Sequence, residues 1–85
     1  MLQEGTELPA DIFRYNNERR QLELFDLPLQ RGRLIEVWVY GDWLPGHLQR
    51  DTTGWYLLTF DYVELRLRAG LYARYRDPFL SFYAR

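Results

Sequence analysis

The sequence contains no cysteine and no lysine, and it has only one serine and one histidine. Without cysteine the chain forms neither disulfides nor thiolate–metal bonds. A single histidine excludes a histidine-based metal cluster within one chain. A serine nucleophile would have to combine Ser81 with His47, and nothing in their spacing favours that arrangement. We therefore expect a protein that is not an enzyme and that needs no cofactor and no metal.

Long apolar segments are also missing. No stretch reaches the roughly eighteen apolar residues that a transmembrane helix needs, and the N-terminus lacks the basic and apolar regions of a signal peptide. We expect a cytoplasmic protein without a membrane partner. The formal net charge of −1 is unlike the strongly basic balance typical of nucleic-acid-binding proteins, so another protein is the partner that we predict first.

The chain has 85 residues, of which 18% are aromatic, and this length predicts one domain that spans 1–85. Alternating polar and apolar residues dominate, which is the pattern of half-buried strands. We expect residues 1–11 to be loosely ordered, residues 12–76 to form the body and residues 77–85 to form a short tail. The expected strands are 20–25, 34–40, 43–50, 55–60, 63–68 and 71–76, and residues 12–15 could pair with the first of them.

The connections between these strands carry turn residues. Asn16–Asn17 and Gly41–Asp42 indicate tight turns, while 27–32 breaks the regular pattern. Pro45 next to Gly46 indicates an edge position or a bulge, because proline cannot donate to a central ladder. Asp77 before Pro78 resembles a helix start, and the tail then places its aromatic residues on one helical face: Phe79, Phe82 and Tyr83.

Many short strands with almost no helix predict an all-β fold. At this length we expect a small SH3-like barrel of five to six antiparallel strands with a short C-terminal helical turn. Closure would remove the exposed edges that a small sandwich leaves.

A resemblance to a known family supports this fold. It is carried by Gly32, by Leu34-Ile35-Glu36-Val37, by Gly41-Asp42-Trp43-Leu44-Pro45-Gly46-His47-Leu48, by Trp55-Tyr56-Leu57 and by Leu65, Gly70-Leu71 and Arg74. Over 14–76 the chain resembles a family of small, uncharacterised bacterial proteins, a domain of unknown function thought to be SH3-like. The resemblance implies the fold and supplies no activity.

Glu36 lies among apolar residues in the strand 34–40, and two assignments are open. If Glu36 faces the core, its buried charge needs an arginine partner. If Ile35, Val37 and Val39 face the core, Glu36 joins Trp38 and Tyr40 in an exposed polar and aromatic strip. We prefer the second assignment because it gives a more uniform aliphatic core.

Two surfaces are candidates for binding. The first is the outer face of a predicted hairpin over 63–76, where arginines alternate with a tyrosine: Arg66, Arg68, Tyr72, Arg74 and Arg76. These guanidinium groups could hold phosphates and stack a base, contact a protein, or pair with acids of the N-terminal segment: Glu4, Glu7 and Asp11. An ordinary ion-paired surface is the interpretation that we weight most.

The second surface consists of aromatic residues near two turns: Trp38, Tyr40, Trp43, Trp55 and Tyr56. These rings could bind an extended peptide or simply fill the core. We predict a non-enzymatic binding or accessory module that acts through protein contacts at Trp38, Tyr40, Trp43, Arg66, Arg68 and Arg74. The alternatives are a nucleic-acid-binding barrel that uses the arginine hairpin, and a structural subunit or homo-oligomer that docks through the aromatic tail.

Overall fold

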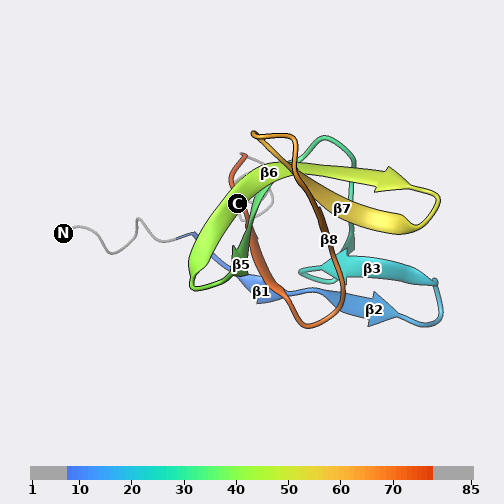
Figure 1. Cartoon of the computed structure of the whole chain (residues 1–85). Coiled ribbons are helices and arrows are strands. Elements are labelled where there is room, and N and C mark those ends of the chain that lie inside the picture. Colours follow the sequence, from blue (N-terminus) through green and yellow to red (C-terminus); the bar gives the residue numbers. More distant parts are fainter. Residues whose placement is uncertain (1–7, 78–85) are drawn as a thin grey trace.

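The computed structural model describes residues 8–77, which form strands and turns (Figure 1). Short strands follow one another because β-branched, aromatic and leucine residues alternate with polar ones between turn residues. The strands are β1 (Asp11–Ile12), β2 (Arg14–Asn16), β3 (Gln21–Leu24), β4 (Leu27–Pro28), β5 (Leu34–Val39), β6 (Asp42–Asp51), β7 (Gly54–Thr59), β8 (Glu64–Arg66) and β9 (Tyr72–Tyr75).

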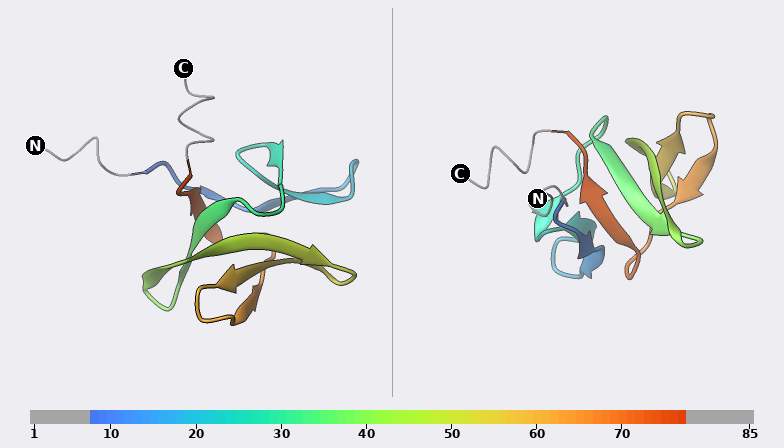
Figure 2. Two further views of the ribbon diagram at one scale, coloured as in Figure 1. Left: turned by 90° about the horizontal axis from the view of Figure 1, so that it is seen from above. Right: turned by 90° about the vertical axis from the view of Figure 1, so that its left-hand side faces the viewer.

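The described strands form two antiparallel sheets. One sheet has six strands in the order β1-β9-β5-β6-β7-β8, and the other has three in the order β2-β3-β4. The chain passes from the larger sheet to the smaller one at Phe13, between β1 and β2. The two views of Figure 2 show the β2–β3 hairpin lying across the larger sheet.

The core lies between the two sheets. Its fully buried side chains come from both of them: Phe13, Leu24, Ile35, Val37, Leu48 and Leu57. Ile35 and Val37 lie on one face of β5, as the alternation predicts for a strand with one buried side. The second assignment for β5 is therefore confirmed for the aliphatic residues.

β6 is long and curved, and it links the two halves of the larger sheet (Figure 1). Its first half pairs with β5, Pro45 opposite Glu36, and its second half pairs with β7 from Gly46 onward. Pro45 thus lies where β6 has a neighbour on only one side, which agrees with the predicted edge position. A Cβ atom on Gly46 would lie 2.5 Å from the Leu58 carbonyl oxygen, so the close approach of β7 requires glycine here.

The prediction of a closed barrel is wrong for the part of the chain that the structure describes. The edge strands β1 and β8 do not pair with each other. The β2–β3–β4 sheet covers the core from one side instead of completing a ring. The all-β class is confirmed, and the predicted helical turn with its rings Phe79, Phe82 and Tyr83 lies outside the described residues.

Several local predictions need smaller corrections. Ile12 belongs to β1, which pairs with β9, so only Arg14–Asn16 forms the predicted hairpin with β3. The irregular segment 27–32 contains the short strand β4. The first tight turn after β5 is Tyr40–Gly41, one residue earlier than predicted. Both residues have positive φ, 54° and 77°, as a two-residue hairpin turn prefers.

Asp77 has a role that the sequence pattern did not predict. Its carboxylate pairs with the guanidinium of Arg33 and accepts a hydrogen bond of 3.2 Å from the backbone nitrogen of Leu34. The side chain therefore fixes the end of β9 to the start of β5. A helix that begins at Asp77 would lie outside the described residues.

Candidate functional site

The predicted arginine hairpin does not form. β8 pairs with β7, and β9 pairs with β5 and β1, so three strands separate β8 from β9 in the sheet. Arg66 and Arg68 consequently lie on one surface, and Tyr72, Arg74 and Arg76 on another. The alternation was predicted correctly for the inward residues from Leu65 onward, which are buried or packed against the core. Val63, predicted to face inward, is 58% exposed, and the pairing of the two strands was wrong.

Glu36 lies beneath two of the predicted arginines. Its exposed fraction is 6%, and its carboxylate accepts hydrogen bonds from Arg74 Nε at 2.6 Å and from Arg76 Nη1 at 2.7 Å. Glu36 is thus on the outer face of β5, as we preferred, but it is covered rather than exposed. Both assignments were partly correct, since the buried carboxylate has the arginine partners that burial requires.

Arg74 connects this cluster to the tryptophans. Its guanidinium carbon lies 4.0 Å from the centre of the Trp43 ring, a favourable cation–π distance. Trp38 is directly opposite Trp43 in the β5–β6 ladder, and the two rings meet edge to face with centroids 5.1 Å apart. One contact network therefore joins Glu36, Arg74, Trp43 and Trp38.

These rings line a shallow hollow of about 310 Å³, which Ala10, Trp38, Trp43 and Tyr72 surround. We call this surface the tryptophan face. Trp38 is 42% exposed and Tyr72 is 54% exposed. Tyr40 is fully exposed in the adjacent turn and does not line the hollow. The structure therefore brings together four predicted residues, namely Trp38, Trp43, Tyr72 and Arg74, with Arg76 joined through Glu36.

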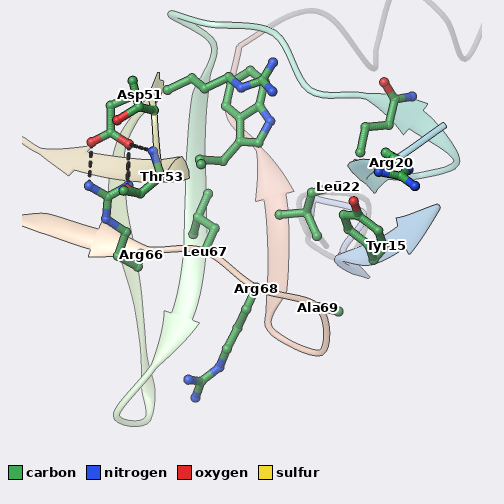
Figure 3. A pocket seen from close by; sticks show the side chains of 14 residues that line it. Tyr15, Arg20, Leu22, Asp51, Thr53, Arg66, Leu67, Arg68 and Ala69 are labelled. Atoms are coloured by element: carbon green, nitrogen blue, oxygen red, sulfur yellow. Dashed lines mark hydrogen bonds and ion pairs between the residues drawn. The ribbon is translucent and has the colours of Figure 1, made fainter. Parts of the chain in front are cut away.

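A second hollow, of about 510 Å³, lies between the β2–β3 hairpin and the region where β6, β7 and β8 meet (Figure 3). We call it the arginine groove. Its lining includes four arginines and two rings: Arg20, Arg50, Arg66, Arg68, Tyr15 and Trp55. Arg66 and Arg68 are the predicted members of this group.

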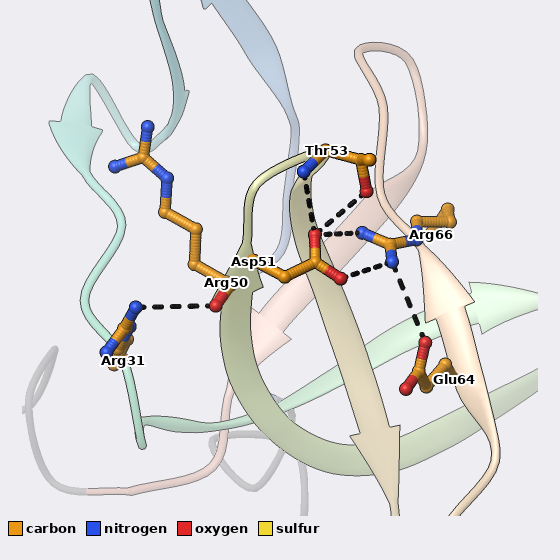
Figure 4. A network of polar contacts seen from close by, with 6 residues as sticks. All are labelled: Arg31, Arg50, Asp51, Thr53, Glu64 and Arg66. Carbon is orange, nitrogen blue, oxygen red and sulfur yellow. Dashed lines mark hydrogen bonds and ion pairs between the residues drawn. The ribbon is translucent and has the colours of Figure 1, made fainter.

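Within the groove Arg66 is neutralised by an acid. Its guanidinium forms two hydrogen bonds with the Asp51 carboxylate, at 2.8 Å and 2.5 Å, and Thr53 donates to the same carboxylate (Figure 4). The hydrogen bond from Arg66, followed by the one from Thr53, holds the pKa of Asp51 far below its usual 3.8. Arg66 thus has a structural partner, as the ion-paired interpretation expected.

The sequence reasoning missed the other half of this groove. Arg20 and Tyr15 belong to the β2–β3 hairpin, and Arg50 and Trp55 face each other across the β6–β7 ladder, where the Arg50 guanidinium lies 5.5 Å from the Trp55 ring. No local pattern links residue 20 to residue 68, because only the packing of the two sheets brings these positions together.

The structure also locates the remaining residues that the sequence analysis named as possible reactive or charged groups. The His47 ring packs edge to face on Phe60, with centroids 5.6 Å apart. Asp11 pairs with Arg14 at 2.9 Å rather than with the predicted outer arginines, and Glu4, Glu7 and Ser81 lie outside the described residues.

Along 8–77 no group of three or more metal-ligating side chains comes together. We also find no helix in this part of the chain with the length and apolar character needed to cross a bilayer.

The fold and these surfaces define a small all-β domain in which two sheets enclose one core and present two ring-lined hollows. The chain belongs to the family described as a domain of unknown function (DUF5348), whose match covers residues 12–75. This agrees with the resemblance to an uncharacterised family. No curated protein and no solved structure matches the chain.

Proposed function

We propose that this protein is a binding module without catalytic activity, which holds an extended segment of another protein on its tryptophan face. The observation that carries the proposal is the contact network beneath the hollow. Arg74 is anchored by the buried Glu36 carboxylate at 2.6 Å and lies 4.0 Å from the Trp43 ring. The rings are therefore held in place before any partner arrives, which reduces the entropy lost on binding.

The residue types also support binding. Tryptophan, tyrosine and arginine are the side chains most enriched at the energetic centres of protein interfaces. Trp38 and Tyr72 keep about half of their surface in water, although a domain of this size needs its large rings for burial. A partner that covers the hollow would remove this apolar surface from water.

An extended segment that contains proline suits the hollow best. The hollow is shallow and lined by flat rings, and aromatic-lined grooves recognise the preformed polyproline helix because little entropy is lost. Arg74 and Arg76 share one carboxylate, so the cluster keeps one positive charge. We therefore expect an acidic residue beside the proline. The sequence led us to expect an SH3-like fold. We include that relationship in the proposal as an analogy of fold.

The three tryptophans provide a direct test by NMR. Proline-containing peptides, with and without a neighbouring aspartate, are titrated into the ¹⁵N-labelled chain while the three indole N–H signals are followed. We expect the Trp38 and Trp43 signals to shift, while the Trp55 signal in the arginine groove stays in place. Unchanged Trp38 and Trp43 signals across the panel would contradict the proposal.

Two variants make the test specific. Trp38→Ala removes a half-exposed ring from the hollow and should weaken peptide binding at least about tenfold, as expected for an interface centre. Tyr62→Asn is the matched control, because Tyr62 is 83% exposed, lies outside the hollow and has a positive φ of 63° that asparagine tolerates. Equal losses in the two variants would exclude the tryptophan face as the site.

A further inference from the structure

The arginine groove concentrates positive charge in a chain whose formal net charge is −1. Four of its lining residues are arginines, and among the described residues that line it Asp51 is the only acid. That acid is engaged by Arg66 through two hydrogen bonds (Figure 4). The groove therefore keeps about three uncompensated positive charges, which come from Arg20, Arg50 and Arg68.

These three arginines have no acidic partner within residues 8–77. Arg50 stacks over Trp55, while Arg20 and Arg68 make no ion pair with the described residues. Arg68 extends away from the Asp51–Arg66 pair (Figure 3). Elsewhere in the described residues carboxylates lie against Arg14, Arg33 and Arg74, at Asp11, Asp77 and Glu36, whereas Arg31 donates only to the Arg50 carbonyl oxygen. Three like charges around one hollow repel one another, and a bound anion would relieve that repulsion.

Aromatic rings accompany these charges. Tyr15 is 50% exposed on the hairpin side of the groove, and Trp55 lies on the opposite side beneath the Arg50 guanidinium. Flat rings next to guanidinium groups are what sequence-tolerant binding of single strands uses, because bases stack on the rings while phosphates meet the cations.

We propose that the arginine groove binds single-stranded nucleic acid. Phosphates contact Arg20, Arg50 and Arg68, and a base stacks on the half-exposed Tyr15 ring, opposite the Arg50–Trp55 pair. The strand is single because paired bases are stacked inside a duplex and do not offer their faces to a protein ring. This site is separate from the tryptophan face, and of the arginines that it uses only Arg68 belongs to the arginine hairpin that the sequence predicted.

Two other polyanions fit the groove less well. An acidic peptide would satisfy the arginines but would gain little from the exposed ring of Tyr15. An anionic membrane would need a convex surface with exposed aliphatic side chains, whereas this site is a hollow whose leucines, Leu22 and Leu67, are buried or partly buried in the core. Both serve as competitors in the test.

The test is fluorescence anisotropy of labelled oligonucleotides with the full chain. Oligo-dT, oligo-U and a duplex of mixed sequence are titrated at low and at moderate salt. We expect both single strands to bind more tightly than the duplex, with affinity falling as salt rises. A difference between the two single strands identifies DNA or RNA as the preferred form. Absence of single-strand binding at low salt would overturn the proposal.

Variants locate the site. Arg20→Ala and Arg68→Ala lie at exposed positions without ion pairs, so both should fold, and each should weaken binding about five- to tenfold and lower the slope of affinity against salt by about 0.7. Tyr15→Leu should weaken binding about fivefold at an unchanged salt slope, since it removes stacking only. Arg14→Ala is the matched control, because it removes the same charge from outside the groove.

Three results would overturn the assignment. One is an equal loss in Arg14→Ala and Arg68→Ala, which would indicate attraction by overall charge. The second is equal competition by poly-glutamate, and the third is tighter binding to vesicles that contain phosphatidylserine. Trp38→Ala should leave oligonucleotide binding unchanged, so this proposal and the peptide-binding proposal can fail independently.

Discussion

Gly46 provides a sharp test of how β6 shapes the domain, through the substitution Gly46→Ala. The added Cβ would lie 2.5 Å from the Leu58 carbonyl oxygen and 2.9 Å from two atoms of the Leu57 side chain. The side-chain contact can relax, although Leu57 is fully buried, but the carbonyl belongs to the β6–β7 ladder. The backbone itself must therefore shift.

Overpacking of this kind costs about 3 kcal/mol at the upper end of the usual range. A domain of this length has a total stability of about 4–13 kcal/mol, so the variant should lose a large share of it. The expected fall in Tm is roughly 12–24 °C. Thermal and urea unfolding followed by circular dichroism measure both quantities.

Gly32→Ala is the matched control for this measurement. Gly32 has a positive φ of 84°, and a Cβ there would have nothing within 4 Å. Alanine at this position costs only the strain of the left-handed conformation, about 1 kcal/mol. If Gly46→Ala were no more damaging than Gly32→Ala, the close approach of β7 to β6 would not be what demands glycine.

Three further predictions concern the charged and buried groups. Glu36→Gln leaves Arg74 and Arg76 without their shared carboxylate and should lower the unfolding free energy by about 2 kcal/mol, the loss expected for hydrogen bonds to a charged group, whereas a loss below about 0.5 kcal/mol in urea unfolding would contradict the role of Glu36 as an anchor. The pKa of Asp51 is lowered in the folded state, so the contribution of its carboxylate to the free energy of unfolding is present above about pH 4 and disappears as the pH falls. The urea midpoints of the native chain and of Asp51→Asn should therefore differ at about pH 7 and converge at lower pH. Burial raises the pKa of Tyr75, so the stability of the native chain should fall as the pH rises above about 10, and Tyr75→Phe should lessen that fall in thermal unfolding; equal falls would contradict it.

The strands and the buried face of each strand could be predicted from the sequence. The residue types and the alternation of polarity predicted the strands, and they placed Ile35 and Val37 inside and Trp38 outside. This works because successive side chains of a strand point to opposite faces, so polarity alone assigns each residue to a face. Pro45 and Gly46 also marked the place where β6 changes partners.

The partners of each strand were decided only in the tertiary structure. The strands over 63–68 and 71–76 read as one hairpin, yet the segment between them crosses from one end of the larger sheet to the other. Backbone hydrogen bonds hold this crossing: Leu67 donates to Trp55, Gly70 donates to Phe13, and Phe13 donates to Leu71. Phe13 is far away in the sequence, so no local pattern could have predicted these bonds.

The same crossing separated the predicted site into two surfaces. Arg74 and Tyr72 joined the tryptophans, whereas Arg68 joined Arg20 and Arg50 from distant strands. Alternation fixes the face of a sheet on which a side chain lies, but only the order of the strands decides which side chains share that face. Strand order follows from how the two sheets bury one common core, and that is a property of the whole chain.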